Sequence, residues 1–426
     1  MYLIDKLDNG IRVVMEKIDY INSVTIGIII SSGSIKENKI NNGASHFIEH
    51  MLFKGTKNRS AREIAEAIDN IGGQLNAFTG KEQTCYYAKV LDQHLPIAID
   101  VLGDMLNNSL FSEEDIEKEK KVIIEEINMY LDEPEDLVFE LLNELMYENT
   151  SLEYPILGDE KTVSSINRKL ILDYFYENYK PQDMVISLAG NFDTKETLKL
   201  LNQHFGFFNR VADNNKLWTD SNEYKFSNKI RGKRRRIEQL NLCLGMRGVN
   251  SCSDDIHPVL VMNNIFGGSM SSRLFQNIRE DKGLAYSVYS HISTFENIGD
   301  FSVYAGLNSE QLIKVVKLIK KEIEYMKENL ISKDELYRSK EQLKGNYILG
   351  MEGTFNRMFE NGKSLFLINR VESPEEIIRK IDDVNLEDIE RVVKKIFIQD
   401  EINVSYVGDI KDSQKSEKEI QDILFN

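Results

Sequence analysis

The stretch GASHFIEHMLFKG, residues 43–55, places two of the chain's six histidines four residues apart, with a glutamate directly before the second. On an α-helix, residues i and i+4 lie on the same face, so His46 and His50 can bind one metal ion through their imidazoles. Apolar residues flank the pair and indicate a buried helix, in which an imidazole pair needs a polar partner. The stretch therefore predicts a metal-binding helix.

Zinc is the metal that this pattern favours. Zinc binds imidazole nitrogens readily, and a catalytic zinc site has three protein ligands and an open position for water. Glu49 adjoins His50 and can turn toward that water as a general base, because zinc-bound water ionises near neutral pH. Taken alone, however, the five-residue motif is equally compatible with a helix surface or a satisfied polar core, so its context has to decide.

A third ligand is expected from a separate element, and the acidic segment EKEKKVIIEEINMY, residues 117–130, offers the candidates. They are Glu117, Glu119, Glu125 and Glu126. Glu119 and Glu126 are seven residues apart, which is two helical turns, and so they share a face. Most acids on such a helix are solvated, and spacing alone does not choose among the four.

Length and charge limit the possible functions. The chain has 426 residues, enough for two or more domains, and its formal net charge is −16. An acidic chain repels phosphate backbones and anionic lipids, so we expect no nucleic-acid partner and no membrane partner, and basic peptides fit best.

The N-terminus lacks a basic region followed by an apolar run, and no apolar stretch could span a bilayer. A cytoplasmic protein is therefore expected.

The periodic pattern breaks between residues 207 and 236, where the sequence is polar and ends in a basic run. We expect a first domain over 1–212, a linker over 213–236 and a second domain over 237–426. The basic run Lys233–Arg236 could form a nucleic-acid patch, but in so acidic a chain a solvated linker is favoured.

The two halves repeat one order of elements. Residues 74–106 read as two strands, a polar break and a long helix. Residues 284–330 read in the same way, although few residues are identical. This order predicts an α+β fold of two similar domains, each a mostly antiparallel sheet covered by helices.

The order His-x-x-Glu-His is the inverzincin pattern. Around it, the sequence resembles the M16 family of zinc metallopeptidases over essentially the whole chain, most specifically over 43–90 and 268–290. It looks most like the branch that contains the β-subunit of the mitochondrial processing peptidase and its bacterial relatives. The resemblance implies a zinc endopeptidase whose two domains form a clamshell chamber around short or unfolded peptides.

The resemblance also implies roles for the residues of the motif. His46 and His50 would bind the zinc, and Glu49 would be the catalytic base. The family's distal glutamate ligand falls on Glu126, while Glu125 is a neighbour that the spacing does not exclude. The second half lacks an HxxEH motif, so one Zn2+ per chain is expected.

Further residues take roles from the same resemblance. Glu119 matches the glutamate that orients a ligating histidine. Asn76 and Ala77 match the edge strand that pairs with an extended peptide. Arg279 and Tyr286 match the pair that reaches the substrate carbonyl from the second domain and stabilises its oxyanion.

Two other functions compete with this interpretation. Some M16 proteins have lost catalysis and serve as partner or scaffold subunits, which predicts loss of the zinc ligands or of Arg279 and Tyr286; all are present here. A nucleotide-binding loop at FGGSMSSRLF, residues 266–275, lacks the Gly-Lys-Ser/Thr signature. We therefore expect an active peptidase, working as a homodimer.

Overall fold

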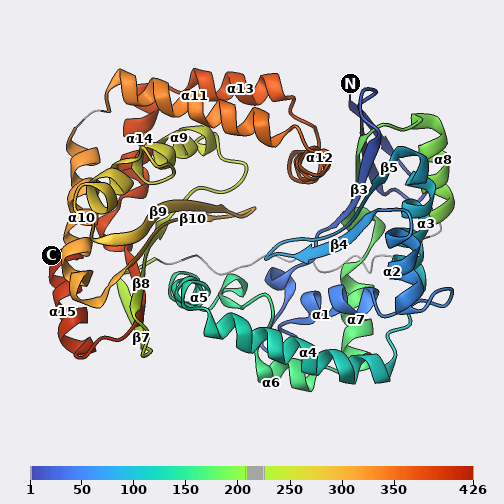
Figure 1. Ribbon diagram of the computed structural model, residues 1–426, viewed down its shortest axis with the longest axis horizontal. Helices are drawn as coiled ribbons and strands as arrows, with labels where there is room; N and C mark the ends of the chain where they lie inside the picture. The colour runs from blue at the N-terminus through green and yellow to red at the C-terminus, as the bar shows by residue number, and fades with distance from the viewer. Residues whose placement is uncertain (1, 207, 209–223, 225, 330, 426) are drawn as a thin grey trace. The chain divides into compact units, whose positions relative to one another are not determined.

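The computed structural model describes residues 2–206, 208, 224, 226–329 and 331–425 (Figure 1). The chain divides into two compact units, each assembled from three segments. Unit 1 comprises Met1–Asn128, Tyr154–Ser221 and Leu349–Glu372, and unit 2 comprises Met129–Glu153, Asn222–Ile348 and Ser373–Asn426. No helix in the described ranges combines the length and apolar composition that crossing a membrane requires.

Unit 1 is built on a six-stranded sheet. Its strands are β1 (Tyr2–Lys6), β2 (Arg12–Lys17), β3 (Ser23–Ile30), β4 (Gln74–Thr79), β5 (Thr84–Leu91) and β6 (Met184–Gly190). They lie in the order β1-β2-β6-β3-β5-β4, and every neighbouring pair is antiparallel except β2 and β6. The central strands β3 and β6 are almost wholly buried, in keeping with their continuous β-branched and apolar runs.

The helices of unit 1 cover both faces of this sheet; all but α12 (Thr354–Ile368) contribute to one large apolar core, and α12 packs on the opposite face in two smaller clusters. The other helices are α1 (Ala44–Leu52), α2 (Ala61–Asp69), α3 (Leu95–Asn108), α4 (Glu113–Asp132, which runs on into unit 2), α6 (Glu160–Ser165), α7 (Arg168–Asn178) and α8 (Thr194–Phe205). A capping box starts α2: the Ser60 side chain accepts from the backbone N–H of Glu63, whose own side chain accepts from the backbone N–H of Ser60.

Unit 2 is built on a five-stranded sheet, and its helices other than α5 (Pro134–Met146) surround a second core. Its strands are β7 (Lys229–Arg234), β8 (Gln239–Arg247), β9 (Ala285–Thr294), β10 (Gly299–Asn308) and β11 (Asn403–Gly408). Its helices besides α5 are α9 (Ile256–Phe266), α10 (Leu312–Glu328), α11 (Lys333–Gly350), α13 (Pro374–Asp383), α14 (Leu386–Ile396) and α15 (Ser413–Leu424). Short helical turns of the two units are η1 (Ser34–Lys36), η2 (Asp92–His94), η3 (Ser151–Glu153), η4 (Pro181–Asp183), η6 (Ser309–Gln311) and η7 (Gln399–Glu401), together with the π-helix η5 (Phe275–Glu280).

The two sheets share one topology. Strands β2-β6-β3-β5-β4 of unit 1 correspond in order to β7-β11-β8-β10-β9 of unit 2. The first pair is parallel in both sheets, and the other pairs are antiparallel. The predicted α+β class, with two similar and mostly antiparallel sheets covered by helices, is confirmed.

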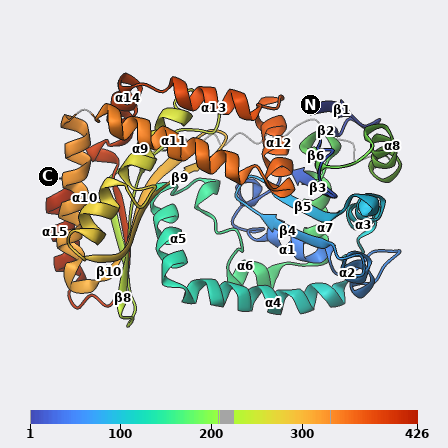
Figure 2. The ribbon, with the colours of Figure 1, turned by 45° about the horizontal axis from the view of Figure 1, so that its top comes forward.

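A helix from the second half of the chain completes unit 1. Helix α12 packs across β3 and β6 (Figure 2), where the Oγ1 atoms of Thr25 and Thr354 lie 2.7 Å apart and Ser187 donates to the carbonyl of Met358 at 2.5 Å. Gly27 permits this approach, because a Cβ there would lie 2.2 Å from the sulfur of Met358.

A helix from the first half completes unit 2 in the same way. Helix α5 lies beside β8 (Figure 1) and packs on β8 and β11. Ser405 donates to the carbonyl of Val138 at 2.7 Å. Just beyond α5, the Tyr147 hydroxyl donates to the buried Asp300 at 2.9 Å. Each unit therefore includes a helix from the other half of the chain. The contiguous domains predicted over 1–212 and 237–426 do not provide for this exchange of α5 and α12.

The predicted linker over 213–236 needs correction where the structure describes it. Residues 213–223 and 225 lie outside the described residues, but Lys229–Arg234 forms the edge strand β7. Its basic side chains pair with acids of unit 2: Lys229 with Glu148 at 2.7 Å and Arg231 with Glu144 at 2.5 Å. An edge strand with charged groups on both faces lacks the period-two pattern by which strands are recognised.

Candidate metal centre

Helix α1 is held at its N-terminus by a buried carboxylate. Gly43, the residue before the helix, has a φ of +91°, and Glu37 accepts hydrogen bonds from the backbone N–H groups of Gly43 and Ser45, both at 2.7 Å. A carboxylate at this end satisfies otherwise unpaired N–H groups and complements the helix dipole. Sequence reasoning missed Glu37, because it lies outside the positions at which capping residues are recognised.

One face of α1 carries the candidate ligands. The rings of His46 and His50 lie with their centroids 4.7 Å apart, as the i,i+4 spacing requires. Lys54 follows after four more residues, and its backbone N–H bonds to the carbonyl of Met51, which continues the last turn. Three side chains of basic type thus follow one another along a single face.

Helix α4 supplies the carboxylate between the two imidazoles. The Glu126 oxygens lie 3.7 Å from Nε2 of His46 and 3.5 Å from Nε2 of His50. Together these three residues form a group of metal-ligand type whose ligand atoms all lie within 4.8 Å of one another. Glu125, the alternative left open by the sequence, is an exposed residue of the same helix and is not part of this group.

Glu119 lies on the same face of α4 and bridges His50 and Lys54. Its Oε2 is 3.0 Å from Nδ1 of His50, and its Oε1 is 2.7 Å from Nζ of Lys54. A carboxylate at Nδ1 favours the tautomer that is protonated there and leaves the Nε2 lone pair for a metal. Lys54 balances the charge of Glu119, whose side chain is 5% exposed.

The donor set fits a zinc ion. Burial, together with the neighbouring His50, lowers the pKa of His46 to about 3, so its imidazole is neutral and can donate a lone pair. Among the described residues, Nδ1 of this buried His46 has no hydrogen-bond partner. Two imidazoles and one carboxylate are a known ligand set for catalytic zinc.

Glu49 lies beside this group and is not one of its members. Burial raises the pKa of its carboxyl above the ordinary value, against the opposing effect of a hydrogen bond from Thr79. That bond runs from the Thr79 hydroxyl, at the end of β4, to Oε2 of Glu49. The arrangement provides a half-buried carboxylate, separate from the ligands, that can accept a proton.

The predicted substrate strand lies at the edge of its sheet. In the described part of the chain, β4 pairs with β5 on one side and with no strand on the other. The side chain of Asn76 is exposed, and its Oδ1 accepts from the backbone N–H of Ala77 at 2.8 Å. An exposed edge of this kind can pair with an extended peptide.

Arg279 and Tyr286 belong to unit 2, where the structure brings them together. The guanidinium carbon of Arg279, in η5, lies 5.6 Å from the ring centroid of Tyr286 and 4.7 Å from that of Phe275. Tyr286 stands near the start of the edge strand β9 and is 78% exposed. Both side chains are thus presented at the surface of unit 2 rather than used in its core.

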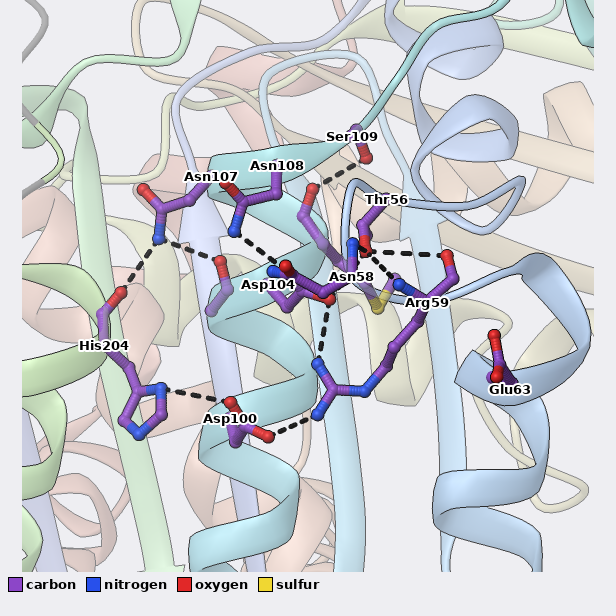
Figure 3. Close-up of polar contacts among 12 residues, drawn as sticks. Thr56, Asn58, Arg59, Glu63, Asp100, Asp104, Asn107, Asn108, Ser109 and His204 are labelled. Carbon is purple, nitrogen blue, oxygen red and sulfur yellow. Dashed lines mark hydrogen bonds and ion pairs between the residues drawn. The ribbon is translucent and has the colours of Figure 1, made fainter.

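The loop that leaves α1 is anchored to α3 by a polar network (Figure 3). Asp104, a buried residue of α3, accepts from the hydroxyl of Thr56 at 2.7 Å, the amide of Asn58 at 2.6 Å and the guanidinium of Arg59 at 2.8 Å. Arg59 also pairs with Asp100 at 2.5 Å. With Glu37 at the other end, both ends of the metal helix are fixed by buried carboxylates.

Comparison with known proteins assigns the family. Residues 12–160 match the insulinase family (peptidase family M16), and residues 165–343 match the peptidase M16 inactive domain. The chain belongs to the M16 peptidase family.

Similar proteins are found in several bacteria. The chain is 44% identical over 392 residues to the "uncharacterized zinc protease YmxG" of Bacillus subtilis, covering 92% of this chain and 95% of that protein. It is 37% identical to the "uncharacterized zinc protease SCO5738" of Streptomyces coelicolor, covering 96% and 90%. These names support a metalloprotease.

Solved structures match the fold. A protease from Helicobacter pylori aligns with a TM-score of 0.90 at 20% identity, over 96% of this chain and 99% of that one. A Pseudomonas fluorescens structure described as a peptidase M16 inactive domain aligns with a TM-score of 0.88 at 17% identity, over 96% and 98%. At these identities the likeness extends to the fold alone.

Proposed function

We propose that the protein is a zinc-dependent endopeptidase that hydrolyses peptide bonds in short or unfolded peptides. The observation that carries the proposal is the group of His46, His50 and Glu126, with Glu49 beside it as a carboxylate that is not a ligand. The three residues would hold one zinc per chain. When bound, zinc polarises a carbonyl and lowers the pKa of its water.

In this proposal Glu49 performs the proton transfers. Its half-buried carboxylate accepts the proton of the attacking water and then delivers it to the nitrogen of the leaving amine. Burial raises the pKa of Glu49 above its ordinary value, which suits a group that must both take and return a proton. His50 is held in the ligating tautomer by Glu119 throughout.

Substrate binding is assigned to both units. The edge of β4 at Asn76 and Ala77 would add the peptide as a further strand, which aligns its backbone without fixing its sequence. Arg279 and Tyr286 would stabilise the oxyanion when the two units close around the peptide as a clamshell, in the manner of the processing peptidases. The net charge of −16 supports basic peptides as substrates. A cytoplasmic homodimer completes the proposal.

The proposal is tested by metal analysis and by cleavage of a quenched basic peptide. We expect close to one zinc per chain, and the Glu49→Gln variant should keep that zinc while losing cleavage about 100-fold or more. Absence of stoichiometric zinc, or full cleavage by Glu49→Gln, would overturn it. Zinc binding without cleavage of any peptide would instead indicate a catalytically silent M16 partner or scaffold subunit.

A further inference from the structure

We propose that Thr79 is a positioning residue for Glu49, so that the strand that would bind the substrate also orients the catalytic base. The inference rests on the proposed peptidase function. It arises from one contact, the hydrogen bond from the Thr79 hydroxyl to Oε2 of Glu49, which joins the last residue of β4 to the metal helix.

The direction of the Thr79 side chain follows from its place in the strand. Side chains alternate between the two faces of a sheet, so Thr79 shares a face with Ala77 and Leu75. Those two residues pack against the core that includes α1, whereas Phe78 belongs to the apolar cluster on the opposite face, with Met358 of α12. Thr79 is therefore aimed at α1.

The neighbouring strand leaves the Thr79 proton available to Glu49. Thr84 is the register partner of Thr79 on β5, and the two hydroxyl oxygens lie 3.4 Å apart. The Thr84 hydroxyl donates to the carbonyl of Ser32 at 2.8 Å, so its proton is directed away from Glu49. The hydroxyl of Thr79 therefore donates to the carboxylate of Glu49 and fixes it.

A fixed carboxylate matters because a general base accepts a proton efficiently only when its oxygen is correctly placed relative to the proton donor. A glutamate has three side-chain torsions, whereas a threonine on a strand has a restricted χ1 and can serve as a rigid donor. With Oε2 held, Oε1 is left to accept a proton from water. Small misplacements of a catalytic group cost up to about 100-fold in rate.

The same strand would align the substrate. Ala77 lies two residues before Thr79, within one strand of six residues. Strand β4 would then position two groups at once: the peptide added along its edge and the carboxylate of Glu49. Because both contact the same strand, their positions relative to each other are fixed. This is the specific role assigned to Thr79, and it does not involve binding of the metal.

The test compares Thr79→Val, which keeps the shape and removes the hydroxyl, with Thr79→Ser, which keeps the hydroxyl. With a quenched peptide, Thr79→Val should lower kcat about 10- to 100-fold with KM nearly unchanged, and Thr79→Ser should restore most of the loss. Zinc content and affinity should match the wild type in both. Thr79→Ala serves as a second hydroxyl-free variant if Thr79→Val folds poorly.

A second readout does not depend on activity. The infrared difference between wild type and Glu49→Gln isolates the carboxylate bands of Glu49. These bands should shift in Thr79→Val and stay in place in Thr79→Ser. The matched control is Thr25→Val, which removes a buried hydroxyl from the same sheet, bonded to Thr354 rather than to Glu49, and should leave both the bands and kcat unchanged.

The outcomes separate this inference from the proposed function. Wild-type kcat or unshifted Glu49 bands in Thr79→Val would overturn the role of Thr79 while leaving the peptidase intact. A zinc-loaded wild type that cleaves no peptide would overturn the proposed function, and the infrared comparison would still decide whether Thr79 fixes Glu49.

Discussion

Nδ1 of His50 lies 3.0 Å from Oε2 of Glu119, and Nε2 of the same ring faces Glu126 at 3.5 Å. The imidazole of His50 therefore contacts two carboxylates: Glu119 orients the ring, and Glu126 can bind the same metal ion as the ring. Since Glu119 is buried and also paired with Lys54, contacts within the protein fix this orientation.

Replacing Glu119 with glutamine should weaken zinc binding about 10- to 100-fold, the usual effect of losing a carboxylate behind a ligating histidine. An amide cannot balance Lys54 and is a poorer acceptor for the His50 proton. Competition with a coloured chelator measures the affinity. Glu117→Gln is the matched control, because Glu117 lies on the same helix but is 68% exposed and pairs with Lys120. Equal affinities in the two variants would contradict the orienting role.

Replacing Lys54 with methionine should lower the free energy of unfolding of the zinc-free protein by about 2 kcal/mol, since it leaves the buried Glu119 without its countercharge. The figure is below that for a fully buried pair, because Lys54 is 35% exposed. Urea titration measures the change. Lys118→Met, which breaks an exposed pair with Glu114, should cost no more than about 0.5 kcal/mol. If Lys54→Met lowered the free energy of unfolding by as little as Lys118→Met, the buried Glu119 would not depend on Lys54 for charge compensation.

Asp300 should make the protein more stable as the pH falls from about 6.5 to 4. Burial raises its pKa to about 6 from 3.8, so folding favours the protonated acid, and a penalty appears as the pH rises through this window. Asp300→Asn removes the penalty and can still accept from Tyr147. At pH 7 it should unfold with a free energy higher by up to about 3 kcal/mol, with the difference vanishing near pH 4.

The measurement for Asp300 is the difference in unfolding free energy between variant and wild type across the pH range, which cancels groups common to both. Asp334→Asn, at a side chain that is 73% exposed, should give a flat difference and serves as the control. A flat difference for Asp300→Asn as well would mean that its carboxyl is ionised in the folded protein at little cost.

Replacing Arg357 with methionine should loosen α12 from unit 1. The guanidinium donates to the buried Glu16 of β2, which also accepts from the amide of Asn361 at 2.8 Å. Loss of the cation leaves this carboxylate uncompensated, and we expect a cost of about 3 kcal/mol in unfolding free energy. Faster amide hydrogen exchange in α12 and β2 would locate the effect. Arg338→Met, whose partner Asp334 is exposed, should change neither quantity.

The sequence predicts the three candidate metal ligands better than it predicts the residues that hold them and Glu49 in place. The spacing of His46 and His50 determines a common helical face, and the structure shows that face directed at α4. Glu126 and Glu125 could not be separated by counting residues, because both fall within the uncertainty of a spacing. The structure separates them by direction, since only Glu126 faces the imidazoles.

Thr79 and Asp104 could not be predicted because each acts across the fold, whereas Glu37 was missed because it lies six residues before Gly43, outside the usual capping positions. Thr79 and Glu49 are 30 residues apart, and Asp104 meets Thr56 across 48. Side-chain contacts of this kind depend on how elements pack, which periodicity does not report. The strand β7 was missed for a related reason, because a charged edge strand carries no apolar alternation.

The exchange of α5 and α12 has a consequence for how the chain is made. Unit 1 begins at the N-terminus, but the helix that covers β3 and β6 is not synthesised until residue 368. During translation the sheet of unit 1 therefore waits, with that face uncovered, while two of the three segments of unit 2, Met129–Glu153 and Asn222–Ile348, are being produced. The nascent chain has to keep an apolar surface from aggregating over this interval, and the last steps in folding of the two units are tied to one another in time.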